Sequence, residues 1–74
     1  MATEHNVVWV IKADEEGAMP EFREESLRGA FKDALARVVS LASSAKFLMG
    51  QVLAADGKVL ATVAPQGSIR LTRE

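Results

Sequence analysis

The sequence lacks several residue types on which common protein chemistries depend. It contains no cysteine, which excludes disulfides, thiolate nucleophiles and thiolate metal sites. It contains no tyrosine, and its single histidine, His5, stands close to the N-terminus. No glycine-rich phosphate loop occurs, and no serine has an evident partner base. We therefore expect a protein that is not an enzyme and that carries no cofactor or metal.

Long apolar runs are also absent. None approaches the roughly 20 residues that a membrane-spanning helix needs. Segment 1–6 is polar and lacks the basic and then apolar order of a signal peptide. We expect a cytoplasmic protein without membrane contact.

Charge of one sign does not dominate either. Nine basic and ten acidic residues give a formal net charge of -1, so no global field draws the protein to nucleic acid. The 74 residues are enough for one domain with a small core. We expect residues 1–74 to form that single domain, with segment 1–6 flexible and His5 exposed to solvent.

One stretch shows clear helical periodicity. It predicts an amphipathic helix that begins at about Glu24 to Ser26 and ends near Ser44. The apolar positions follow spacings of three and four: Leu27, Ala30, Phe31, Ala34, Leu35, Val38, Leu41, Ala42 and Ala45. A longer version would continue to Gly50, whereas the version ending near Ser44 leaves 47–55 as a strand. We adopt the shorter helix.

The segment before this helix is ambiguous. Segment 13–17 is an acidic turn that ends in Gly17. Met19 and Phe22 would suit a short strand or an irregular arm, whereas Pro20 is at home in a first helical turn. We favour the short strand or arm.

Residues 7–12 predict a strand because four β-branched residues and Trp9 stand together. Val7, Trp9 and Ile11 point to one face, and Val8 and Val10 point to the other. Both faces are apolar, which is typical of a strand that is covered on two sides.

The C-terminal third predicts a hairpin and an edge strand. Asp56 and Gly57 separate two apolar runs, which indicates a two-residue hairpin loop with Leu53 opposite Leu60. A turn at 65–67 leads to an alternating strand over 68–72. The complete pattern predicts an α+β fold with one helix on one face of a mostly antiparallel sheet of three to four strands, in the order β-α-β-β-β.

One helix can cover only one face of that sheet. Because the first strand and the hairpin carry apolar residues on both faces, we expect another chain to cover the second face. A homodimer is the default, since most soluble oligomers have twofold symmetry, and an unidentified protein is the alternative. The expected interface residues are Trp9, Leu53, Leu60, Thr62 and Arg70.

The chain resembles a small family of uncharacterised bacterial domains. The matching pieces are the acidic turn 14–17, Pro20-Glu21-Phe22, the alanine-containing helix through Ala34, and the hairpin 56–63. Each piece is generic, and no activity is established for that family, so this resemblance implies a fold and no site.

A second similarity is to the antitoxin half of some bacterial toxin–antitoxin pairs. Segment 25–27 corresponds to the start of the antitoxin helix. Those antitoxins usually add a DNA-binding segment, whereas this chain ends soon after its last strand. The similarity therefore implies a module that only binds a partner.

Taken together, the sequence favours a non-catalytic protein–protein interaction module, such as an adaptor, an antitoxin-like protein or an inhibitor, that acts as a homodimer. One alternative is a nucleic-acid-binding accessory protein that uses Lys58, Arg70 and Arg73. A second alternative is a small enzyme with an acid-based site that the sequence does not reveal.

Overall fold

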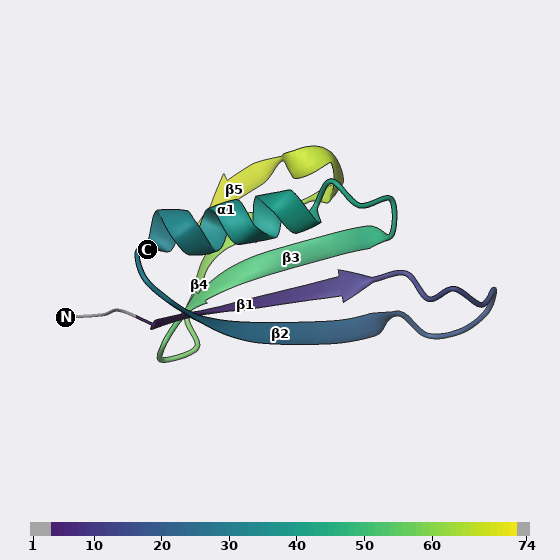
Figure 1. Ribbon diagram of the computed structural model, residues 1–74, viewed down its shortest axis with the longest axis horizontal. Helices are drawn as coiled ribbons and strands as arrows, with labels where there is room; N and C mark the ends of the chain where they lie inside the picture. The colour runs from purple at the N-terminus through teal and green to yellow at the C-terminus, as the bar shows by residue number, and fades with distance from the viewer. Residues whose placement is uncertain (1–3, 73–74) are drawn as a thin grey trace.

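The computed structural model describes residues 4–72 and contains one α-helix, five strands and a short 3₁₀ turn in that range. The elements follow one another in the order shown in Figure 1. Their bounds are β1 Glu4–Ile11, β2 Glu21–Arg28, α1 Phe31–Leu41, β3 Phe47–Ala54, β4 Val59–Val63, η1 Pro65–Gly67 and β5 Ile69–Leu71.

The strands form one sheet in the order β2-β1-β3-β4-β5, and every neighbouring pair is antiparallel. Helix α1 lies on one side of this sheet and contacts β1, β3 and β4 (Figure 1). The predicted α+β class, with a single helix on one sheet face, is therefore confirmed. The loop between β1 and β2 projects past the end of the helix (Figure 1).

The predicted strand count and order are wrong at one point, because β2 is an additional strand of eight residues. It pairs with the whole of β1, from Glu4 opposite Arg28 to Ile11 opposite Glu21. Its first half was predicted as a short strand or an irregular arm, and its second half was predicted as the start of the helix. Pairing along the full length of β1 decides the conformation, since the local sequence suits either structure. The fold is thus β-β-α-β-β-β.

The helix is shorter than predicted and begins later. Ser26 lies within β2, and α1 starts at Phe31 after the chain turns at Gly29, whose φ of +136° is readily reached only by glycine. The helix ends at Leu41, ahead of the predicted boundary near Ser44. The strand reading of segment 47–55 is confirmed by β3.

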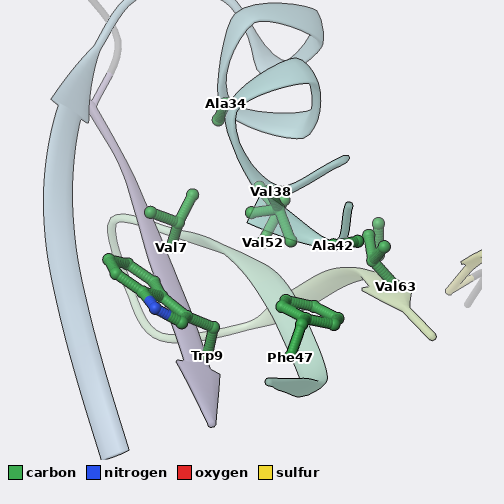
Figure 2. Close-up of a cluster of buried hydrophobic side chains, with 9 residues drawn as sticks. Val7, Trp9, Ala34, Val38, Ala42, Phe47, Val52 and Val63 are labelled. Carbon is green, nitrogen blue, oxygen red and sulfur yellow. The ribbon is translucent and has the colours of Figure 1, made fainter. Parts of the chain in front are cut away.

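The core lies between α1 and the facing side of the sheet (Figure 2). The helix contributes small residues at four-residue intervals, Ala34, Val38 and Ala42. The strands contribute Val7, Trp9, Phe47, Val52, Ala61 and Val63. Spacings of four place the helical residues on one stripe, which is the face that the sequence periodicity identifies.

Gly50 determines how closely the helix approaches β3. A Cβ atom at this position would lie 2.6 Å from Cγ1 of Val38 and 3.0 Å from Cζ of Phe47. Both distances are shorter than normal van der Waals contact. The absence of a side chain at Gly50 therefore lets Val38 and Phe47 fill the space above the middle strand.

The hairpin between β3 and β4 has a longer loop than predicted. The Ala54 N–H donates to the Lys58 carbonyl at 2.8 Å, and the Gly57 N–H donates to the Ala54 carbonyl at 2.9 Å. The loop therefore has three residues, 55–57, with Gly57 at a φ of +93°. Beyond it Leu53 pairs with Val59, and Val52 pairs with Ala61. Leu60 is the extra residue of a bulge, so the predicted pairing of Leu53 with Leu60 is wrong.

The remaining predictions on the C-terminal segment are confirmed. Residues 65–67 form a turn, and β5 is an edge strand that pairs only with β4. Ile69 and Leu71 share one side of this strand, as the alternation predicts, because they pair with Val63 and Ala61 of the core.

The loop before β3 is tied to the end of β1. The Lys12 N–H donates to the Lys46 carbonyl at 2.7 Å, and the Lys46 ammonium forms an ion pair with Asp14. The hydrogen bond and charge of Lys46 lower the pKa of the Asp14 carboxyl below its ordinary value. The three acidic residues of segment 14–16 are thus not all free, since one of them connects two loops.

Replacing Gly50 by alanine should lower the free energy of unfolding by about 1–3 kcal/mol, the usual cost of overpacking a core. Urea denaturation measures the change. The same replacement in a Val38→Ala background should cost less, because the closest clashing atom is absent there. Equal costs in the two backgrounds, or no cost in either, would contradict this account of the packing.

The Asp14 ion pair should make stability depend on pH in the acid range. Because the pKa of Asp14 is lowered on folding, the contribution of the pair is complete above the unfolded-state pKa and disappears as pH falls through the folded-state pKa. NMR titration of the carboxyl should therefore show a depressed pKa in the wild type and an ordinary one in Lys46→Gln. An unchanged titration in Lys46→Gln would exclude the pair as the cause.

Candidate interaction surface

The sheet has one face that α1 does not cover, which we call the open face. The strand registers assign its residues, since directly paired residues point to the same side. They are Glu4, Asn6, Val8, Val10, Phe22, Glu24, Ser26, Arg28, Met49, Gln51, Leu53, Val59, Thr62 and Arg70. Within residues 4–72 no helix or strand packs across this face (Figure 1).

Apolar exposure on the open face is concentrated at one end. Val10 pairs with Phe22 on one side and with Met49 on the other, so the three form a row that we call the apolar cluster. Phe22 is 67% exposed and Met49 is 39% exposed. A shallow hollow of about 60 Å³ lies between them. Met19, in the loop that leads into β2, adds an 85% exposed side chain near this end.

The predicted placement of Trp9 on this face is wrong. Trp9 belongs to the core cluster with Val7 and Val38 and is only 9% exposed (Figure 2). Its neighbour on β3 is Gly50, which lies on the same, helix-covered side of the sheet. Trp9 is therefore a core residue, although it also borders the hollow between Phe22 and Met49.

The other predicted interface residues divide into two groups. Leu53, Thr62 and Arg70 lie on the open face as expected. Leu60 does not, because the bulge in β4 places it in a hollow that is also lined by Phe31 of the helix and Leu71 of β5. A single extra residue in a strand is enough to move a side chain to the opposite face of the sheet.

Val10, Phe22 and Met49 are not among the predicted interface residues. The alternation of β1 already assigns Val10 to the face opposite Trp9, so one signal is present in the sequence. Phe22 gives no such signal because its segment is ambiguous between a short strand, an irregular arm and a helix start. Met49 lies in the stretch that is ambiguous between helix and strand.

Four charged residues lie on the open face. Glu4 pairs with Arg28 in the strand register near one end, whereas Glu24 on β2 and Arg70 on β5 stand at opposite edges. Neither Glu24 nor Arg70 forms an ion pair with any other residue of the range 4–72.

Three other charged side chains of β2 are engaged in ion pairs. Glu25 pairs with Arg37 of the helix at 3.1 Å, and Glu21 pairs with Arg23 at 2.7 Å.

The predicted basic group is not assembled into one site. Lys58 follows the hairpin loop, whereas Arg70 pairs with Thr62. Four residues along a strand separate Lys58 from Thr62, which is about 13 Å at 3.3 Å per residue. Arg73 lies outside the described residues.

His5 is buried, contrary to the expectation of a solvated terminal residue. It lies in β1 and is 7% exposed. Its Nδ1 lies 3.1 Å from the Gly29 carbonyl oxygen, and its ring packs at 6.1 Å from that of Phe31. These contacts connect β1 to the entrance of the helix, so His5 has a structural role at this junction.

A hollow of about 500 Å³ lies at the C-terminal end of α1. Its lining includes Ser43, Ser44 and Gln66 but no acidic, basic or histidine side chain. No group of three or more potential metal ligands occurs within residues 4–72. The helix found in that range is too short to cross a membrane.

The chain matches no known protein-family model, no curated protein and no solved structure. The geometry of the open face is therefore the main guide to function.

Trp9→Ala should lower the free energy of unfolding by about 3–5 kcal/mol, the usual cost of removing a core aromatic. Phe22→Ala should change it by no more than about 0.5 kcal/mol, because the Phe22 side chain is already exposed to solvent. Chemical denaturation of the two variants at a concentration where the wild type is monomeric provides the comparison. Similar costs for both variants would contradict the assignment of these aromatics to core and surface.

Proposed function

We propose that the protein is a non-catalytic protein–protein interaction module that uses the open face of its sheet and acts as a homodimer. The observation that carries the proposal is the contrast between the two faces. Helix α1 covers β1, β3 and β4 on one face and leaves Ile69 and Leu71 of the edge strand exposed there. The other face has no such cover among the described residues and exposes the apolar cluster of Val10, Phe22 and Met49.

The chemical character of the open face supports this proposal. Exposed apolar patches with a polar rim are typical of protein interaction sites. Aromatic residues, methionine and arginine are enriched at such interfaces. The open face provides one of each, in Phe22, Met49 and Arg70, with Glu24 at the opposite edge.

The two alternatives have less support. As a candidate general base, His5 is buried and its Nδ1 already faces the Gly29 carbonyl. For nucleic acid, sites for single strands combine a basic groove with several stacking aromatics. The described open face offers one aromatic, Phe22, and carries Glu24 beside it along β2. An adaptor, an antitoxin-like protein and an inhibitor all agree with the proposal, as does a cytoplasmic location.

Phe22→Asp should abolish binding through the open face, because it places a charge in the centre of the exposed apolar end. Sedimentation over a dilution series measures self-association, and capture from a cell extract measures binding to other proteins. Both readouts compare the wild type with Phe22→Asp and with Ala36→Asp. Ala36 is exposed on the helix, so Ala36→Asp adds the same charge away from the open face.

The proposal predicts that the wild type and Ala36→Asp behave alike and that Phe22→Asp loses at least one of the two kinds of binding. Urea denaturation of Phe22→Asp confirms that the variant is folded. If all three proteins are monomeric and retain the same set of proteins, the open face is not a binding surface and the proposal is wrong.

A further inference from the structure

The strand registers align five residues in one row across the open face. Glu24 pairs with Val8, Val8 with Gln51, Gln51 with Thr62, and Thr62 with Arg70. The row therefore runs from an acidic residue on β2 to a basic residue on β5. Strand β3, which holds Gln51, is the middle strand of the five.

The two charges are too far apart to pair with one another. Four strand spacings separate β2 from β5, which is about 19 Å at 4.8 Å per spacing. Glu24 and Arg70 also have no ion-pair partner within residues 4–72. Among the described residues, Glu24 and Arg70 thus present charges without an ion-pair partner on the same side of the sheet and at the same level along the strands, and Arg28 is a further such charge on β2, at the level of Glu4.

We propose that the partner on the open face is a second copy of this chain, related by a twofold axis that runs parallel to β3. This inference rests on the proposed function and specifies its partner. Rotation about such an axis places the row of one subunit against the same row of the partner subunit, with the residues in the opposite order. Glu24 then faces Arg70 of the partner subunit, and the same pair forms again at the other edge.

The charges also distinguish this axis from the other one in the plane of the interface. A twofold axis along the row, perpendicular to the strands, would place Glu24 against Glu24 of the partner subunit. Like charges in that position repel, whereas the axis parallel to β3 converts both contacts into attraction. Aligned face-to-face packing of two sheets is one of the two common arrangements of such layers.

The centre of the interface is self-complementary under the same operation. Met49, Gln51 and Leu53 alternate on the open face of β3, so each meets its own counterpart. The Gln51 amide has both donors and an acceptor and can pair with an identical amide. Met49 and Leu53 supply apolar contact on either side of it.

Charge exchange between Glu24 and Arg70 tests the geometry. Sedimentation over a dilution series at low salt should give a dimer dissociation constant about tenfold higher for Glu24→Arg and for Arg70→Glu, since each variant replaces two attractions by two repulsions. The double variant with both substitutions should regain wild-type affinity, because the pairs are restored with their charges exchanged. Glu16→Arg and Lys32→Glu are the matched controls, at exposed positions away from the open face.

The possible outcomes separate this inference from the proposed function. Weakening by both single variants, recovery in the double variant and unchanged controls would support the twofold arrangement. A dimer whose dissociation constant is unchanged by the charge variants, but which is lost in Phe22→Asp, would overturn the arrangement and leave the proposed function intact. A wild type that stays monomeric up to about 1 mM would overturn the inference and the homodimer part of the proposed function. The capture experiment with Phe22→Asp would then decide whether the open face binds another protein.

Discussion

The close approach of α1 to the middle strand is the constraint on which the rest of the structure depends. It requires a glycine at position 50 and a helical stripe of small residues, Ala34, Val38 and Ala42. A helix that lies so close to β3 covers β1, β3 and β4 and reaches the edge strand β2 only at its margin. The Glu25–Arg37 ion pair connects the helix to β2 at that margin. The fold therefore places its whole apolar core on one side and leaves the other side of five strands to other interactions.

Much of the architecture could be predicted because it depends on local chemistry. Segment 47–54 and the edge strand β5 follow from β propensity and alternation, and Gly57 follows from the positive φ that its turn needs. Strand β2 could not be predicted in this way. Leu27 continues the helical spacing of Phe31 and Ala34, and Pro20 suits a helix start. Only pairing with β1, which is a tertiary interaction, decides in favour of the strand.

The candidate site was harder to predict than the fold because alternation separates two faces without showing which one a helix covers. Val7 and Trp9 were separated correctly from Val8 and Val10, yet Trp9 was assigned to the wrong side. The deciding feature is Gly50, which pairs with Trp9. A helix can approach only a face that offers space, and Gly50 leaves that space for Val38 of the helix on the side of Trp9. Leu60 was misplaced for a different reason, since a bulge shifts the faces by one residue.

The open face is not uniformly apolar, and this has a physical consequence. Val8 is only 8% exposed although no helix covers it, because its paired neighbours Glu24 and Gln51 stand on either side. The middle of the face is thus shielded by its own polar side chains, while apolar exposure is concentrated at Phe22 and Met49. Affinity on such a surface comes mainly from the apolar end, whereas orientation comes from the charges at the edges. A partner that matches both features needs opposite charges about 19 Å apart, which is the spacing that the open face itself presents.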